Sequence, residues 1–142
     1  MKDLLLTFYK GIARENEGTK IWLTGSLAID LHGVKLRRSV GDLDIMVPKG
    51  TELKDIRIPK GYEELPHIEK EGYNPILRVW HPIFGFKIEF MVQELDDEPV
   101  WIESQQIWVS KLEDILAAKR YYVENGLDKD EKHKQDLYFI GL

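Results

Sequence analysis

The chain has 142 residues and no cysteine, with 20 Lys plus Arg against 25 Asp plus Glu. This length suits one compact domain over residues 1–142, and the lack of cysteine excludes disulfides, zinc–thiolate sites and cysteine nucleophiles. The net charge of −5 argues against an extensive nucleic-acid-binding surface. No apolar run approaches the roughly 20 residues of a membrane helix, and the run 4–6 is too short for a secretory signal. We therefore expect a cytoplasmic protein that has no membrane partner.

The first part of the chain predicts two helices and one buried strand. Apolar residues recur at helical spacing over residues 3–16, and Gly18 is placed to end that helix. Residues 21–23 form a short apolar run, which is typical of a buried strand. Ser26 then stands where a helix N-cap is expected, before a short helix that ends at Gly33.

A basic, turn-forming segment over residues 35–41 leads into the next strand. Apolar and polar side chains alternate over residues 42–47, which predicts a half-buried strand that Pro48 closes. Residues 51–75 are polar and contain several prolines and glycines, so we expect loops there and one short helix at most.

Strands dominate the next part of the chain. The segments 76–80 and 84–92 are predicted to form a hairpin through His81-Pro82, and a brief strand follows at 107–109. With the two earlier strands these make a mixed sheet of about five strands.

Two further helices follow the last strand. Ser110 and Glu113 have the spacing of a capping box, and the helix that they begin is expected to stop at Gly126. Asp130 is placed to cap a final helix. The sequence therefore predicts an α/β (α+β) fold, with a mixed sheet of about five strands flanked by four helices.

The most informative motif is Asp42-Leu43-Asp44. Residues two apart on a strand point to the same face, so the carboxylates of Asp42 and Asp44 are expected side by side. Two ionised carboxylates this close repel each other, and a hard divalent cation with oxygen ligands, such as Mg²⁺, relieves the repulsion. The alternative is that both form the solvated face of an edge strand.

Two other features could join this pair. Gly25 lets backbone approach a ligand closely, and the Ser26 hydroxyl with the first helix N–H groups could bind phosphate. The alternative is an ordinary strand-to-helix turn. Glu89 lies on the opposite strand face from three apolar neighbours, so it completes a carboxylate triad if its strand lies beside that of Asp44. The alternative is a solvated face formed by Lys87 and Glu89.

This order of motifs resembles the nucleotidyltransferase superfamily of the DNA polymerase β type. The resemblance implies a nucleotidyltransferase-like fold in which Gly25 and Ser26 hold a nucleoside triphosphate. It implies that Asp42, Asp44 and Glu89 are the catalytic residues and bind two Mg²⁺ ions. The implied reaction moves a nucleoside monophosphate onto a hydroxyl group and releases pyrophosphate.

A narrower resemblance, to the abortive-infection nucleotidyltransferase toxins, lies in the segments 38–41, 109–119 and 132–137. It implies that Arg38, Lys119 and Lys134 contact the triphosphate and that Asp136 is a structural partner of one of these cations. It also implies a possible antitoxin partner.

We therefore expect a Mg²⁺-dependent nucleotidyltransferase whose acceptor is an RNA 3′ end, a protein or a small molecule. One alternative is a nucleotidyltransferase-fold module that has lost catalysis and serves in binding or regulation. Another is a purely structural interaction domain without a ligand.

Overall fold

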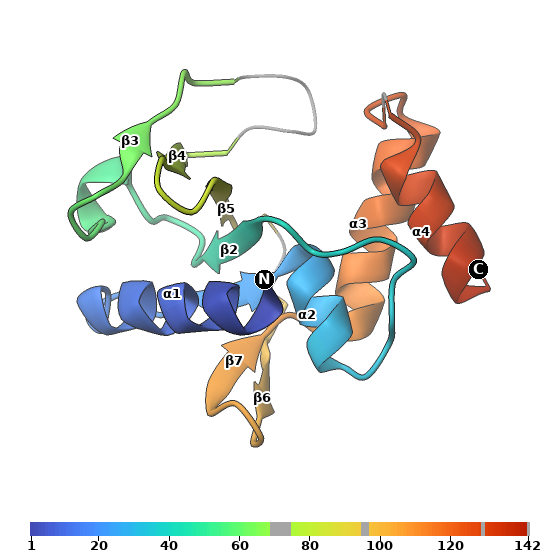
Figure 1. Cartoon of the computed structure of the whole chain (residues 1–142), viewed down its shortest axis with the longest axis horizontal. Helices are drawn as coiled ribbons and strands as arrows, with labels where there is room; N and C mark the ends of the chain where they lie inside the picture. The colour runs from blue at the N-terminus through green and yellow to red at the C-terminus, as the bar shows by residue number, and fades with distance from the viewer. Residues whose placement is uncertain (69–74, 95–96, 129, 142) are drawn as a thin grey trace.

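The computed structural model describes residues 1–68, 75–94, 97–128 and 130–141, which form one sheet of seven strands with four α-helices (Figure 1). In chain order the elements are α1 (Lys2–Glu15), β1 (Trp22–Thr24), α2 (Gly25–Leu31), β2 (Leu43–Val47), the 3₁₀ turn η1 (Leu53–Asp55), β3 (Glu63–Glu64), β4 (Leu77–His81), β5 (Phe86–Val92), β6 (Val100–Ile102), β7 (Ile107–Val109), α3 (Leu112–Glu124) and α4 (Lys132–Ile140). No helix in the described part of the chain is long and apolar enough to cross a membrane.

The strands follow the order β3-β4-β5-β2-β1-β7-β6. β2 pairs with β5, and β1 with β7, in parallel, whereas the other neighbours are antiparallel. The mixed sheet and the four helices confirm the predicted fold class. The prediction of about five strands missed β3 and β6, which lie at the two edges of the sheet and have only two and three residues.

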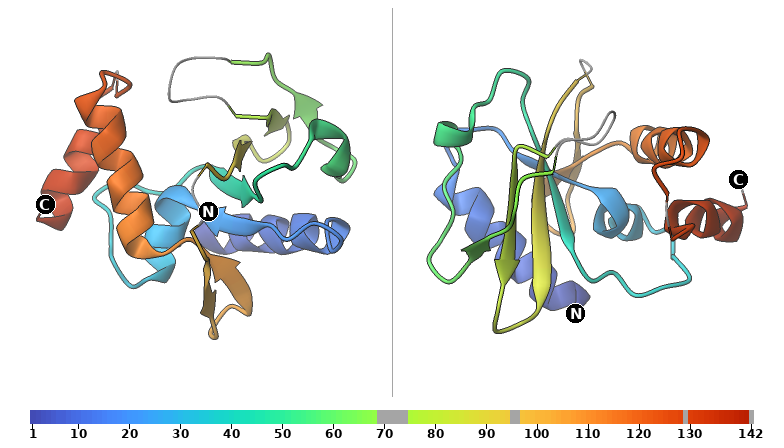
Figure 2. Two further views of the ribbon diagram at one scale, coloured as in Figure 1. Left: turned by 180° about the vertical axis from the view of Figure 1, so that it is seen from behind. Right: turned by 90° about the horizontal axis from the view of Figure 1, so that it is seen from above.

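Helices cover both faces of the sheet (Figure 2). α1 lies alone across one face, with Leu5, Leu6, Tyr9 and Ile12 buried, while α2, α3 and α4 lie on the other. The rings of Phe8 on α1 and Phe86 on β5 are 5.0 Å apart, so the apolar face of β5 points toward α1. Because side chains alternate along a strand, the polar residues of β5 point toward α2, α3 and α4.

Asn16, rather than Gly18, ends α1. The side-chain amide of Asn16 donates to the carbonyl oxygens of Ile12 and Arg57, both at 2.8 Å, and its own carbonyl accepts from the Arg57 N–H. The helix therefore stops where a side chain satisfies its last carbonyls and ties it to a distant loop.

The two C-terminal helices begin differently from the prediction. The hydroxyl of Ser110 accepts from Trp22 Nε1 instead of capping α3. At α4, Asp128 rather than Asp130 accepts the free N–H groups, from His133 and Lys134, each at 2.9 Å.

Candidate active site

Four residues form one row across the middle of the sheet. Thr24 on β1 pairs with Asp44 on β2, Asp44 pairs with Glu89 on β5, and Glu89 pairs with Arg78 on β4. The row lies on the face that α2, α3 and α4 cover, since the intervening residues of β2 and β5 are buried on the α1 side. Asp44 and Glu89 are therefore direct neighbours, although they come from distant parts of the chain.

Asp42 lies immediately before β2 and beside the start of β5. Its Oδ1 accepts the backbone N–H of Lys87 at 2.8 Å, which holds the carboxylate beside the row, two residues before Asp44 along the chain. The spacing of Asp42 and Asp44 predicts that both share one face, and the alternating burial of β2 agrees with this.

The charge of Asp44 is disfavoured where it stands. Burial, followed by the negative charge of Glu89, raises the pKa of Asp44 to about 6, and Asp42 adds to the effect. The positive charges of Lys132 and Lys87 oppose it without cancelling it. A carboxylate in this position gains from any further cation placed against it.

Gly25 makes room for Asp44. Its φ of +71° favours glycine, and a Cβ atom at this position would overlap the Asp44 carboxylate. The glycine is thus required by the backbone conformation and by the closeness of the carboxylate together.

Glu89 is buried and held by two cations. Arg78 Nε lies 2.9 Å from Glu89 Oε2, and Lys87 Nζ lies 3.5 Å from Oε1. Arg78 was not among the site residues predicted from the sequence. The predicted hairpin did not fix the register, and it is the observed pairing of His81 with Phe86 that sets Arg78 opposite Glu89.

Ser26 lies in the first turn of α2, where Thr24, not Ser26, occupies the N-cap position. Its Oγ accepts a hydrogen bond from Arg38 Nη2 at 2.8 Å and from Lys119 Nζ at 3.4 Å. Asp136 binds both cations, through Arg38 Nε at 3.2 Å, Arg38 Nη2 at 2.8 Å and Lys119 Nζ at 3.0 Å. We call Ser26, Arg38, Lys119 and Asp136 the Ser26 cluster.

Burial shapes the charges of this cluster. Burial lowers the pKa of Lys119, and the hydrogen bond that Lys119 donates to Asp136 only partly offsets this. Burial would raise the pKa of Asp136, but hydrogen bonds from Arg38 and Lys119 outweigh it and hold that pKa below its usual value. Burial, followed by the charge of Lys119, lowers the pKa of His133 to about 4, so His133 is neutral at pH 7 and its Nδ1 can accept from Lys119 Nζ at 3.1 Å.

The structure does not bring Lys134 to the Ser26 cluster. Lys134 is exposed on α4 and lines a cavity of about 450 Å³ together with Arg37 and Tyr138. Lys132, which the sequence reasoning missed, is close enough to Asp44 for its charge to lower the pKa of that carboxyl. Residues two apart on a helix point about 200° apart, so the two lysines cannot serve the same site.

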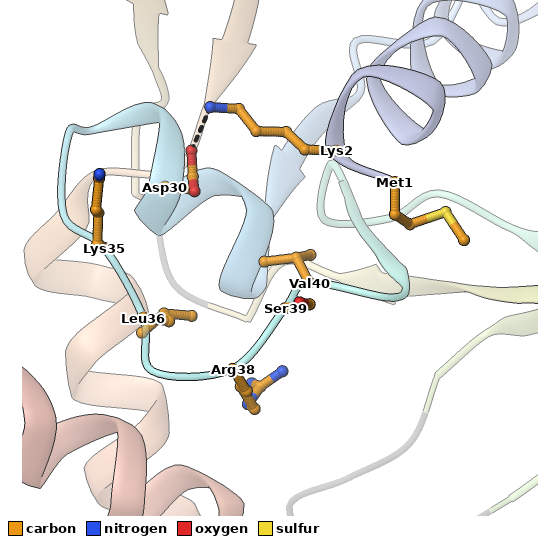
Figure 3. Close-up of a pocket in the computed structure, with 8 residues that line it drawn as sticks. All are labelled: Met1, Lys2, Asp30, Lys35, Leu36, Arg38, Ser39 and Val40. Atoms are coloured by element: carbon orange, nitrogen blue, oxygen red, sulfur yellow. Dashed lines mark ion pairs between the residues drawn. The ribbon is translucent and has the colours of Figure 1, made fainter.

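A second cavity, of about 320 Å³, adjoins Arg38 (Figure 3). It lies between the N-terminus, α2 and the segment 35–40, and the Lys2–Asp30 ion pair at 2.6 Å forms part of its wall. The carboxylates of the row do not line this cavity, so the cavity and the row are distinct.

The carboxylates fit Mg²⁺ as a pair rather than as a triad. No group of three or more His, Asp or Glu side chains among the described residues is arranged to hold a metal ion. Asp42 and Asp44 nevertheless offer adjacent hard oxygen donors at a position where negative charge is disfavoured. One or two carboxylates are what Mg²⁺ commonly takes from a protein, with water and phosphate oxygens completing its shell.

Comparison with protein-family models and with curated proteins finds no match. Among solved structures, the chain is similar to the solution structure of the antibiotic-resistance factor ANT(2″)-Ia, with a TM-score of 0.64 and 14% identity over 99% of this chain and 86% of that one. It is also similar to the crystal structure of ANT(2″)-Ia in complex with adenylyl-2″-tobramycin, with a TM-score of 0.58 and 15% identity over 97% and 88%. The chain has a nucleotidyltransferase-like fold. JHP933 from Helicobacter pylori gives a TM-score of 0.47 at 21% identity over 83% of this chain and 55% of that one.

Proposed function

We propose that the protein is a Mg²⁺-dependent nucleotidyltransferase. The observation that carries the proposal is the row in which Asp44 lies directly beside Glu89, with Asp42 two residues before Asp44 along the chain, on a sheet of the nucleotidyltransferase-like fold. The raised pKa of Asp44, caused by burial and by Glu89, marks this as a position that a cation would stabilise.

In this proposal Asp42 and Asp44 hold the metal, and Ser26 and Arg38 bind phosphate oxygens. The metal that Asp42 and Asp44 would hold would supply Lewis-acid chemistry, which makes the attacking hydroxyl more acidic and neutralises the charge of the leaving pyrophosphate. We assign to Glu89 the acceptance of the hydroxyl proton or, alternatively, the role of ligand to a second ion. Positioning and charge neutralisation are most of what such a transfer requires of a protein.

In this proposal the order of the residues in the row sets the side from which the acceptor attacks and the side on which pyrophosphate leaves. Ser26 follows β1, at one end of the row, whereas Glu89 and Arg78 lie at the other. The attacking and leaving oxygens are roughly in line at phosphorus. The pyrophosphate would therefore leave over α2, and the acceptor hydroxyl would attack from the side of β5 and β4. The new bond joins the acceptor oxygen to the α-phosphorus while the bond from that phosphorus to pyrophosphate breaks.

A second candidate function is a nucleotide-binding module without turnover. Its supporting observation is that Arg78 and Lys87 hold Glu89, so the third carboxylate already has two cationic partners. Nucleotide binding without pyrophosphate release on any acceptor would favour this alternative.

Thermal unfolding with each nucleoside triphosphate, with and without Mg²⁺, tests the binding site. A ligand at 100 times its Kd stabilises by about 2.7 kcal/mol, which raises the Tm of a domain of this size by about 5–10 °C. We expect a Mg²⁺-dependent rise that Asp42→Ala/Asp44→Ala abolishes. Glu63→Ala/Glu64→Ala, which removes two exposed carboxylates from edge strand β3, is the matched control and should keep the rise. An equal rise in both double variants would refute the site.

Turnover is then measured as pyrophosphate release with an RNA 3′ end, a protein or a small hydroxyl compound as the acceptor. An aminoglycoside belongs in the last group because ANT(2″)-Ia was solved with adenylyl-2″-tobramycin. Release that requires Asp44 would support the transferase. The antitoxin partner stays a prediction from the sequence resemblance, and its test is co-purification with a neighbouring gene product.

A further inference from the structure

The hydroxyl of Ser26 is the meeting point of two cationic side chains. A serine hydroxyl has two acceptor lone pairs and one O–H donor, whereas guanidinium and ammonium groups can only donate. Arg38 Nη2 at 2.8 Å and Lys119 Nζ at 3.4 Å therefore both donate to Ser26 Oγ. The hydroxyl hydrogen must point away from both cations, where only a further acceptor can receive it.

Lys119 has no hydrogen left for a ligand. Its side chain is 4% exposed, and its ammonium lies within hydrogen-bond distance of three acceptors: Asp136 Oδ2 at 3.0 Å, His133 Nδ1 at 3.1 Å and Ser26 Oγ at 3.4 Å. An ammonium has three hydrogens, so these contacts use all of them. The sequence resemblance implies a triphosphate contact for Lys119, but this geometry gives it internal partners.

Asp136 fixes the second donor. Both of its oxygens bind Arg38, through Nε and Nη2, so the guanidinium plane is held in the orientation that brings Nη2 to Ser26. Asp136 is 2% exposed at its side chain, whereas Arg38 is 31% exposed and lines the cavity of about 320 Å³ (Figure 3). Of the three buried members of the cluster, Ser26 is the most exposed as a whole residue, at 8% against 3% for Lys119 and 1% for Asp136.

We propose that Lys119 and Asp136 are positioning residues that fix the Ser26 hydroxyl with its O–H directed at a phosphate oxygen of the nucleotide, without touching the nucleotide themselves. This inference rests on the proposed function, because it assumes that Ser26 binds the triphosphate. It assigns direct contact to Ser26 and Arg38 and indirect action to Lys119 and Asp136.

Calorimetric titration with inorganic triphosphate in the presence of Mg²⁺ tests this division of roles. The proteins are wild type, Ser26→Ala, Lys119→Met and the double variant Ser26→Ala/Lys119→Met. A hydrogen bond to a charged group is worth about 1.5–3 kcal/mol, so each single variant should bind about 10-fold to 100-fold more weakly. Because Lys119 acts through Ser26, the double variant should bind no more weakly than Ser26→Ala.

Three further variants serve as controls or substitutes. Arg120→Met, an exposed neighbour of Lys119 on α3, should bind triphosphate as wild type does. Ser26→Thr keeps the hydroxyl and should restore most of the affinity that Ser26→Ala loses. Should Lys119→Met fail to fold, Asp136→Asn, which keeps the size of the side chain, replaces it. It is then measured both alone and in combination with Ser26→Ala.

The outcomes separate this inference from the proposed function. If Lys119→Met weakens binding by the same factor with and without Ser26, Lys119 touches the phosphate and the positioning role is wrong. Unchanged affinity in a folded Lys119→Met would also overturn it, while the proposed function would stand. If wild type binds no triphosphate, the proposed function itself fails.

Discussion

The Asp44 carboxyl destabilises the folded chain when it is ionised. Burial and Glu89 raise its pKa from 3.8 to about 6 in the folded chain. Between about pH 4 and pH 6 the folded state therefore binds more protons than the unfolded state, and stability falls as pH rises through this window.

Asp44→Asn should remove this loss of stability, because asparagine keeps the shape without the charge. In metal-free buffer with chelator, we expect the variant to exceed wild type by on the order of 2–3 kcal/mol at pH 7.5 and to match it near pH 4. Urea unfolding at both pH values measures the difference. Asp3→Asn, an exposed carboxyl in the first turn of α1, is the control and should give no such pH-dependent gain. A variant less stable than wild type at pH 7.5 would contradict the electrostatic account.

At the scale of the element, α4 depends on a carboxylate outside it. Asp128 accepts the N–H groups of His133 and Lys134, and these bonds lower its pKa although burial opposes them. Asp128→Ala should lower the free energy of unfolding by about 1 kcal/mol, the usual value of a helix cap. Asp130→Ala removes an exposed acid from the same loop and should change it little. Equal losses in the two variants would show that loop charge, rather than capping, supports α4.

Elements with a clear period were predictable, and their ends were not. A period of 3.6 located α1 and a period of two located β2, whereas a short apolar run located β1 and capping residues located α2, α3 and α4. The predicted caps were wrong because tertiary contacts provide other partners for the capping side chain or for the helix N–H groups. Ser110 has the spacing of a cap, but tertiary packing places Trp22 Nε1 within 3.0 Å of its hydroxyl. Asp128 and Asp130 are two residues apart before α4, and their spacing in the sequence does not decide which of them caps the helix.

At the scale of the whole molecule, the apolar contacts with α1 and the candidate site lie on opposite faces of the sheet. α1 covers one face (Figure 2). The carboxylate row occupies the other face. Leu5→Ala empties a fully buried position on α1 and should cost about 3 kcal/mol in unfolding free energy. It should leave the Kd for Mg²⁺–nucleotide unchanged at a temperature where the variant is folded. Leu53→Ala, at a half-exposed position, is the matched control and should cost less than about 1 kcal/mol. A changed Kd in Leu5→Ala would show that the two faces are coupled.

Some residues of the candidate site follow from local strand geometry, whereas others depend on how distant elements pack together. Asp42 and Asp44 were predictable because strand geometry alone aligns them. Glu89 could be included only on condition that its strand lies beside β2, which the parallel pairing satisfies. The choice between Lys132 and Lys134 depends on the rotation of α4 about its axis, and helix periodicity in so short a segment does not fix that rotation.

The row forms during folding only once β2 and β5 have paired in parallel. β2 ends at Val47 and β5 begins at Phe86, so Asp44 meets Glu89 only when a long-range contact forms, and such contacts add a loop-closure entropy cost and slow folding. A fragment that contains only one of the two strands has half of the acid pair. Nucleotide binding at the row would therefore report on the intact sheet, and a bound ligand would protect the molecule against global unfolding rather than against fraying at its ends.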